Sequence, residues 1–380
     1  MILHLLHDDK ICNRIVSNFS EALKGVNKYV CICDTNHLQY MCEDDTRVIL
    51  VDSGNGEVDE DVLNDIDTIV IHFLNIDKIN FVKRYFPIDS NIKIYWVLWG
   101  GDLYEKVLYT RGYDIYYEPQ FVYINSIKFK LIDSAVSLLS PQRSFRRIVE
   151  QISDFILSRV NYILTTDAES KIIKQYLGCE IQAKCIDRGP IYYPVEDVLG
   201  SLMNEYVEGN NIMIGNSASF SNNHLLAMEL LSKLDTTARK KYVPLSYGGS
   251  PQYIRHIESK GQNFFDSNFC PLKSFMPIEE YNRLMLSCSV FVYCNWRQEA
   301  VGNIVIALYL GAKVFVSGKS PLIEYFQSKG IKLYITETMT QYEIDMPEDN
   351  KVVEHNRKAI MDLFSKSSIL NHIKDIFPAS

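Results

Sequence analysis

IKIYWVLWGGDLY occupies residues 92–104, an apolar run that ends in two glycines and a carboxylate. A run this apolar predicts a strand buried on both faces, as in the middle of a parallel sheet. Similar short runs, separated by helix-like segments, occur at residues 1–7, 28–34, 46–52, 68–74 and 162–167. This alternation predicts an α/β domain built on a doubly wound parallel sheet.

A second series of short apolar runs follows the loop-like DRGPIYYPVEDV at 187–198, where two prolines and a glycine indicate a linker. These runs occur at residues 211–216, 242–249, 289–295, 312–318 and 332–337. We therefore expect two Rossmann-like domains, residues 1–195 and 205–380, that face a central cleft. The final helix is a candidate to pack back on the first domain.

Composition restricts the class of protein. With 380 residues and 47% hydrophobic content, the chain is long enough for two packed cores. A net charge of −8 argues against a nucleic-acid-binding protein, which would present a basic face. Nine cysteines without a CxxC pair indicate reduced core residues.

The sequence also bears on location. No apolar stretch approaches the roughly 20 residues needed to span a bilayer, and the initial run reaches two aspartates too soon for a signal peptide. We therefore expect a cytoplasmic protein, with peripheral contact with the cytoplasmic face of the inner membrane as an alternative.

Polar residues gather where the predicted strands of the first domain end, which is where open parallel sheets bind ligands. Gly100 and Gly101 are expected to turn the chain sharply with positive φ and to admit a ligand close to the backbone. Asp102 would then lie at the rim of the cleft. The alternative is a plain turn in which Asp102 caps a helix formed by LYEKVLY at 103–109.

The second domain offers two phosphate-binding loops. In RQEAVGNIVIALYLGAKVFV at 297–316, a helix is expected to begin at Gly302 and Asn303, and its amino end attracts anions. Arg297 could add a bidentate donor. GNSASFSNNH at 215–224 is the second loop, although Asn and Ser are also ordinary cap residues. In FCPLKSFMPIEEY at 269–281, Phe275 could clasp a nucleobase, with a core position as the alternative.

Five segments together resemble the 4-alpha-N-acetylfucosaminyltransferases of glycosyltransferase family 56. They are WGGDLY (99–104), GNSASFSNNH (215–224), PLSYGG (244–249), MPIEEYNRLMLSCSVFV (276–292) and RQEAVGNIVIALYLGAKVFV (297–316). The resemblance implies a GT-B fold of two Rossmann-like domains, with the acceptor on the first and the nucleotide-sugar on the second. It implies transfer of a 4-acetamido-fucose from a TDP-sugar to a lipid-linked saccharide, as in enterobacterial common antigen assembly, or in an O-antigen or capsule pathway.

No cofactor and no essential metal are implied by this resemblance, although HDD at 7–9 keeps a metal-binding alternative open. TDP is the expected nucleotide, with GDP or UDP as alternatives. A metal-independent enzyme must neutralise the leaving diphosphate with cationic side chains and helix termini. The diphosphate-binding residues are expected to be Arg297, Gly302, Asn303, Gly215, Asn216 and Ser217.

The remaining roles follow from the same mechanism. If displacement is direct, a base on the first domain must accept the proton of the acceptor hydroxyl. Asp102 is the first candidate, followed by His72, His7 and Asp8, and a structural role for His72 is the alternative. If the reaction retains configuration, no base is needed and Asp102 would instead bind the acceptor sugar. We expect His7, Gly100 and Gly101 to bind the acceptor. We expect the donor sugar and nucleoside to contact Glu299, Tyr247, Gly248, Gly249 and Phe275.

Residues 105–160 are a candidate for peripheral membrane contact. Arg143, Arg146 and Arg147 lie beside an apolar face of a predicted helix, and aromatic residues crowd the preceding stretch. The alternative is an internal packing helix. Two other functions remain open: another GT-B enzyme, either a UDP- or GDP-sugar transferase or an epimerase, and a non-enzymatic two-lobed anion-binding protein.

Overall fold

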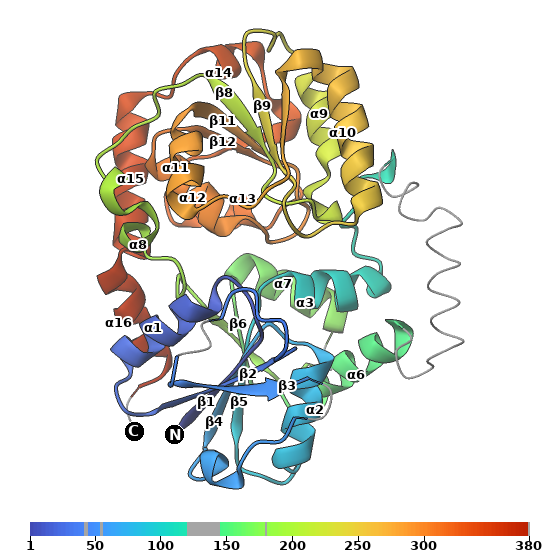
Figure 1. The fold of residues 1–380 in the computed structure, drawn as a ribbon, viewed down its shortest axis with the longest axis vertical. Helices are drawn as coiled ribbons and strands as arrows, with labels where there is room; N and C mark the ends of the chain where they lie inside the picture. The colour runs from blue at the N-terminus through green and yellow to red at the C-terminus, as the bar shows by residue number, and fades with distance from the viewer. Residues whose placement is uncertain (42–44, 54–55, 120–144, 179–180, 379–380) are drawn as a thin grey trace. The chain divides into compact units, whose positions relative to one another are not determined.

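The computed structural model describes residues 1–41, 45–53, 56–119, 145–178 and 181–378 (Figure 1). The chain forms two compact units. Unit 1 consists of Met1–Tyr113, Leu131–Tyr193 and Lys366–Ser380. Unit 2 consists of Asp114–Lys130 and Pro194–Ser365.

The described part of unit 1 contains a seven-stranded sheet in the order β3-β2-β1-β4-β5-β6-β7, and each neighbouring pair is parallel. Because β1, β4 and β5 are adjacent, the residues that follow them lie side by side at the carboxyl edge. The strands are β1 (Ile2–Leu6), β2 (Asn27–Cys33), β3 (Val48–Asp52), β4 (Thr68–His72), β5 (Lys93–Val97), β6 (Tyr162–Thr165) and β7 (Lys184–Asp187). The sequence patterns predicted all of these except β7, whose four residues KCID carry a charge at each end.

Helices cover both faces of this sheet (Figure 1). α1 and α16 pack on one face, where Phe19 and Ile373 join the core formed with Tyr29 and Val97. α2 and α6 lie on the other. The helices and turns are α1 (Cys12–Ala22), η1 (Glu60–Leu63), α2 (Ile76–Tyr85), α3 (Gly101–Leu103), η2 (Tyr104–Leu108), η3 (Tyr109–Arg111), α6 (Phe145–Ser158), α7 (Asp167–Leu177) and α16 (Lys366–Ile376).

Unit 2 has a six-stranded parallel sheet within its described residues, in the order β10-β9-β8-β11-β12-β13. Its adjacent strands β8, β11 and β12 place three successive loops at one carboxyl edge. The strands are β8 (Asn211–Ile214), β9 (Lys241–Pro244), β10 (Phe269–Leu272), β11 (Cys288–Tyr293), β12 (Lys313–Val316) and β13 (Tyr334–Ile335).

Two helical layers enclose the sheet of unit 2 (Figure 1). α9 and α10 bury Met228 and Ile257 on one face, whereas α11, α12 and α15 bury Met285, Ile306 and Ile360 on the other. The helices and turns are α8 (Val195–Leu199), η6 (Gly200–Leu202), η7 (Phe220–Asn222), α9 (His224–Leu231), α10 (Pro251–Phe265), η8 (Asp266–Asn268), α11 (Ile278–Leu286), α12 (Val301–Tyr309), α13 (Leu322–Ser328), η9 (Thr336–Thr338), α14 (Gln341–Asp345) and α15 (Asn350–Phe364).

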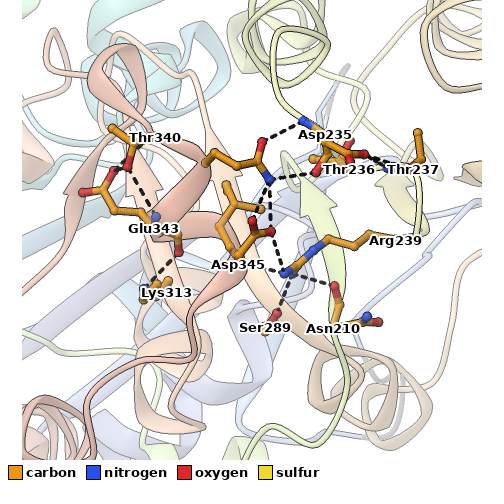
Figure 2. Close-up of polar contacts among 12 residues, drawn as sticks. Asn210, Asp235, Thr236, Thr237, Arg239, Ser289, Lys313, Thr340, Glu343 and Asp345 are labelled. Carbon is orange, nitrogen blue, oxygen red and sulfur yellow. Dashed lines mark hydrogen bonds and ion pairs between the residues drawn. The ribbon is translucent and has the colours of Figure 1, made fainter.

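A polar network lies at the amino edge of this sheet, opposite the carboxyl edge with the loops after β8, β11 and β12 (Figure 2). Arg239 donates to the carbonyl of Asn210 at 2.9 Å and to Ser289 Oγ at 3.2 Å. Lys313 donates to the carbonyl of Glu343 in α14 at 2.9 Å. Arg239 also donates to the carbonyl of Ile344 at 2.7 Å and pairs with the carboxylate of Asp345 at 3.8 Å, both in α14. The two cations therefore hold α14 in place.

The units differ from the predicted domain ranges at residues 114–119, whereas the final helix was already a candidate to pack on the first domain. Residues 114–119 belong to unit 2, because Asn223 binds the carbonyl of Ile115 at 3.2 Å and the amide of Tyr117 at 2.9 Å. The segment from Lys366 belongs to unit 1, where Ile369 packs against α1. A cleft shared by the two domains stays a prediction.

Candidate active site

The two predicted phosphate loops of unit 2 are joined by one carboxylate. Glu299 accepts hydrogen bonds from Ser221 Oγ at 2.6 Å and from Asn222 Nδ2 at 3.3 Å, both in the loop after β8. It also accepts from Asn295 Nδ2 at 2.7 Å and pairs with Arg297 at 3.1 Å, both after β11. Glu299 therefore fixes the two loops against each other.

The same ion pair compensates the charge of Arg297. Both side chains are about nine-tenths buried, so their mutual attraction is only weakly screened. Lys319, which follows β12, is different because it is exposed and no ion pair is found for it among the described residues. Its Nζ lies 3.4 Å from the centroid of the Trp296 ring, within cation–π range. Lys319 is therefore an accessible cation at this edge.

The amino end of α12 lies between these side chains in the sequence. The helix begins at Val301, one residue before the predicted start, and its N-cap Ala300 has φ +64°. Within the described chain, the amides of Val301, Gly302 and Asn303 have no backbone or side-chain acceptor. Three N–H groups thus remain for an anion, supported by the helix dipole.

The loop after β8 has a compact shape that requires its glycines. Gly215 has φ +68°, and a Cβ there would lie 2.6 Å from Asn222 Oδ1. That same oxygen accepts from the amide of Asn216 at 3.0 Å. A Cβ on Gly249 would lie 2.3 Å from the carbonyl of Ala218, so only glycine allows this backbone approach.

Two side-chain oxygens at this edge are buried and have no donor among the described residues, Asn216 Oδ1 and Asn295 Oδ1. A buried acceptor without a donor is costly unless a ligand or water supplies one.

Phe275, beyond the end of β10, is 65% exposed, so the alternative that it belongs to the core is wrong. Tyr247 is half-buried, and its carbonyl accepts from the amide of Ala218 at 2.7 Å.

In unit 1, Asp102 is completely buried. Its Oδ2 accepts from the amide of Leu74 at 3.0 Å and the indole of Trp96 at 2.7 Å, and its Oδ1 accepts from the amide of Trp99 at 3.1 Å. Burial raises the pKa of this carboxyl group, and the three donors oppose that shift. Asp102 thus fixes the ends of β4 and β5 and does not cap a helix.

The glycines before Asp102 differ from each other. Gly100 has φ +101°, as predicted, whereas Gly101 does not adopt positive φ. A Cβ on Gly101 would meet the Phe73 ring at an ordinary 3.5 Å. The prediction of positive φ at Gly101 is therefore wrong, because a single left-handed residue completes this turn.

His72 lies in a buried hydrogen-bonded chain whose proton positions can be assigned. Asn27 Oδ1 can only accept, so His4 Nε2 donates to it at 3.0 Å, and His4 Nδ1 must accept from His72 Nε2 at 3.0 Å. His72 Nδ1 then accepts from Tyr192 OH at 2.9 Å. The phenol oxygen accepts from Trp99 Nε1 at 3.0 Å. Burial lowers the pKa of His4 to about 4 and that of His72 well below its usual value.

His7 has a different partner, the buried ammonium group of Lys78. Lys78 Nζ donates to His7 Nδ1 at 3.0 Å, to the carbonyl of Phe73 at 3.0 Å and to the carbonyl of His72. Burial, with the nearby Lys78 charge, lowers the pKa of His7 to about 2, so its imidazole is neutral. Asp8 accepts from the amides of residues 39–41 at 2.5–3.0 Å and holds the loop after β2.

Comparison with known proteins shows the family of this chain. The model of the family described as 4-alpha-L-fucosyltransferase glycosyl transferase group 56 matches residues 159–373, more than half of the chain. The chain belongs to glycosyltransferase group 56. This confirms the resemblance noted in the sequence.

Solved structures with similar folds include glycosyltransferases of the GT-B type. Sucrose-phosphate synthase from Thermosynechococcus elongatus has a TM-score of 0.63 at 12% identity, over 99% of this chain and 98% of that one. Anabaena HepE, solved with UDP and glucose, has a TM-score of 0.63 at 10% identity, over 100% and 99%. WaaG, a glycosyltransferase of lipopolysaccharide biosynthesis, has a TM-score of 0.57 at 12% identity, over 100% of both chains. At these identities the likeness shows the fold, and the predicted GT-B fold is confirmed.

This group 56 protein also has functional candidates that the sequence reading missed: Lys78, Phe73, Trp99 and Lys319. Lys78 could have been found, since it lies four residues before Val82 on the buried face of α2. Phe73 carried no such signal, because phenylalanine seldom adopts positive φ and nothing in its residue type predicts it. Lys319 stands in an ordinary turn sequence, SGKS.

The described residues include only part of the segment predicted to contact a membrane. Arg143 and the side chain of Arg146 lie outside the described residues, as do residues 120–144 of the predicted contact segment. The apolar face of α6, including Ile152 and Phe155, is buried in unit 1, as in the packing-helix alternative. Among the described residues, no helix is long and apolar enough to cross a bilayer, and no cluster of three candidate metal ligands occurs. Metal independence stays a prediction.

Proposed function

We propose that this group 56 glycosyltransferase moves a fucose-type 4-acetamido-deoxyhexose from TDP to a lipid-linked saccharide during bacterial surface polysaccharide synthesis. The family's description as 4-alpha-L-fucosyltransferases supports a fucose-type sugar. UDP in the HepE structure supports a nucleoside diphosphate as the carrier, since that protein shares the fold. GDP and UDP remain the alternative nucleotides.

One observation carries this proposal: the carboxyl edge of unit 2 combines open helix amides with an accessible cation. Transfer leaves negative charge on the β-phosphate, which fixed donors must stabilise. The amides of Gly302 and Asn303 and the ammonium of Lys319 supply such donors. Because Arg297 is compensated by Glu299, we assign that pair the task of shaping the loops.

The remaining residues of this edge suit the sugar and the nucleoside. The buried oxygens of Asn216 and Asn295 can accept hydrogen bonds from sugar hydroxyl groups. Phe275 exposes a ring on which a nucleobase can stack. Gly215, Ser217 and the segment Tyr247-Gly248-Gly249 bring backbone close to the ligand.

We assign acceptor binding to the carboxyl edge of unit 1, near His7, Gly100 and Gly101. Asp102, His72, His7 and Asp8 were the candidate bases, but each is engaged by donors or buried partners. We therefore propose that Asp102 positions the strand ends and does not remove the proton of the acceptor.

The test combines nucleotide binding with transfer. The melting temperature is measured with TDP, UDP and GDP, and release of the nucleoside diphosphate from each nucleotide-sugar is followed with and without a lipid-linked saccharide. We expect the largest shift with TDP and acceptor-dependent release from a TDP-sugar. Lys319→Ala should weaken TDP binding by roughly tenfold. Lys329→Ala is the matched control, since Lys329 also lies over a ring, that of Tyr325, but follows α13.

The outcomes separate the alternatives. A larger shift and transfer with UDP or GDP would change the donor but keep the reaction. Conversion of the nucleotide-sugar without an acceptor would indicate an epimerase or a hydrolase. An absence of any nucleotide effect would refute the assignment of the donor site.

A further inference from the structure

Three half-buried rings meet at the carboxyl edge of unit 1. His7 follows β1, Phe73 follows β4, and Trp99 lies just beyond the end of β5, so the rings come from three adjacent strands. The centroid of His7 lies 5.2 Å from those of both Phe73 and Trp99, and the latter two lie 5.8 Å apart. We call His7, Phe73 and Trp99 the ring cluster.

Phe73 adopts a backbone conformation that bulky residues avoid. Its φ is +64°, in the left-handed region. Lys78 Nζ donates to its carbonyl at 3.0 Å, and its amide donates to the carbonyl of Val97 at 3.3 Å. The next amide, of Leu74, is held by Asp102 at 3.0 Å. Strained residues that are held in this way from several sides concentrate at functional sites.

His7 presents a hydrogen-bond donor of fixed polarity. Because the ammonium of Lys78 donates to Nδ1, the proton of the neutral imidazole lies on Nε2. The part of the chain that the structure describes offers this Nε2–H no acceptor. The Nδ1 lone pair is occupied, so His7 in this state donates a hydrogen bond and does not act as a base.

Trp99 is oriented from two sides. Its backbone amide donates to Asp102 Oδ1 at 3.1 Å, and its indole N–H donates to Tyr192 OH at 3.0 Å. A buried cation and a buried anion, Lys78 and Asp102, therefore fix the backbone or side chain of every member of the ring cluster. Such a preorganised set of rings with one directed polar group is typical of ligand sites.

We propose that the ring cluster binds the acceptor through a pyranose ring, with the apolar face of the sugar against Phe73 and Trp99 and one sugar oxygen accepting from His7 Nε2. This inference deepens the proposed function and rests on it for the identity of the acceptor. A pyranose suits the cluster because it offers C–H groups on one face and oxygen acceptors at its edge. A purely apolar ligand would leave the His7 donor unsatisfied.

The test uses octyl glucoside, octyl N-acetylglucosaminide and octyl glucuronide as probes, without any nucleotide-sugar. In saturation-transfer NMR, the pyranose protons of at least one glycoside should receive more saturation than the octyl chain. Trp99→Leu and Phe73→Gly should each reduce this signal at least fivefold. Glycine adopts φ +64° without strain, so Phe73→Gly removes the ring while keeping the turn.

Two further variants separate binding from folding. His7→Gln retains an acceptor for Lys78 and an N–H donor, and should keep most of the binding, whereas His7→Leu should lose it. Tyr342→Ala removes a 72% exposed ring of unit 2 and should change nothing. Melting temperatures of all variants are measured; if Phe73→Gly melts early, Phe73→Asn replaces it, because Asn tolerates the left-handed region.

Saturation confined to the octyl chain, or equal pyranose signals in the wild type, Trp99→Leu and Phe73→Gly, would overturn the inference. These outcomes do not depend on catalysis. The proposed function fails separately, if no nucleotide-sugar supports transfer to a saccharide.

Discussion

Asp102→Asn distinguishes a positioning carboxylate from a catalytic base. The substitution keeps the shape of the side chain but leaves a single oxygen for the three N–H groups of Leu74, Trp96 and Trp99. Its amide N–H₂ must then face at least one of these donors. A buried donor left without an acceptor costs about 1–3 kcal/mol.

The other two hydrogen bonds lose the assistance of a full charge, which contributes about 1 kcal/mol each. Part of this loss is offset, because a neutral amide is cheaper to bury than a carboxylate whose pKa is already raised by burial. We therefore expect a loss of about 3 kcal/mol in the free energy of unfolding. In a domain of this size, that lowers the melting temperature by about 6–12 °C.

Kinetics provide the decisive comparison. If Asp102 positions the strand ends, the KM for the acceptor should rise roughly tenfold, while kcat at saturating acceptor and the KM for the donor change little. Loss of a general base would instead lower kcat by about 10²- to 10⁴-fold. Asp67→Asn is the matched control, because Asp67 is an exposed carboxylate just before β4. A large fall in kcat with an unchanged melting temperature and acceptor KM would refute the positioning role.

Three further predictions follow from buried charges. Glu299→Gln removes the carboxylate charge that faces the buried Arg297 and should destabilise unit 2 by about 3 kcal/mol in denaturant unfolding; unchanged stability would remove Glu299 as the link between the loops. Burial lowers the pKa of Lys78 to about 8, so above this pH it no longer fixes the His7 tautomer, and the acceptor KM should rise while the donor KM does not. Above pH 8 the unfolded chain still binds this proton, whereas the folded chain has lost it, so the contribution of Lys78 to the free energy of unfolding rises with pH. Unfolding therefore does not explain a higher acceptor KM. Since the pKa of His4 is about 4 in the folded chain, the free energy of unfolding should fall by about 3 kcal/mol between pH 6.5 and pH 4; a flat profile would contradict the neutral histidine chain.

The sequence was informative where local pattern determines structure. Buried strands of a parallel sheet are apolar on both faces, so nearly all strands and both sheets could be predicted. The start of α12 was predicted to within one residue, because its apolar run begins directly after a polar segment. β7 escaped because KCID is short and charged at its ends, and β10 escaped because FCPL is short and contains a proline.

The hydrogen-bond and ion-pair partners of the site residues could not be predicted in the same way. Asp102 stands in a turn sequence that suits a cleft rim. Its carboxylate is nevertheless buried and accepts hydrogen bonds from β5 and from the segment after β4. No motif around Asp102 in the sequence indicates these donors. Arg297 looks like an available cation until Glu299, two residues later, is seen to pair with it. Such roles depend on side-chain contacts that residue type and spacing do not encode.

The central claim is that unit 2 holds the nucleoside diphosphate at the loops after β8 and β11. Hydrogen–deuterium exchange of the whole chain, with and without TDP, tests it most directly. The account predicts slower exchange at residues 215–224 and 295–303 when TDP is present, including the first amides of α12. Slower exchange confined to unit 1, with those two loops unchanged at saturating TDP, would contradict it.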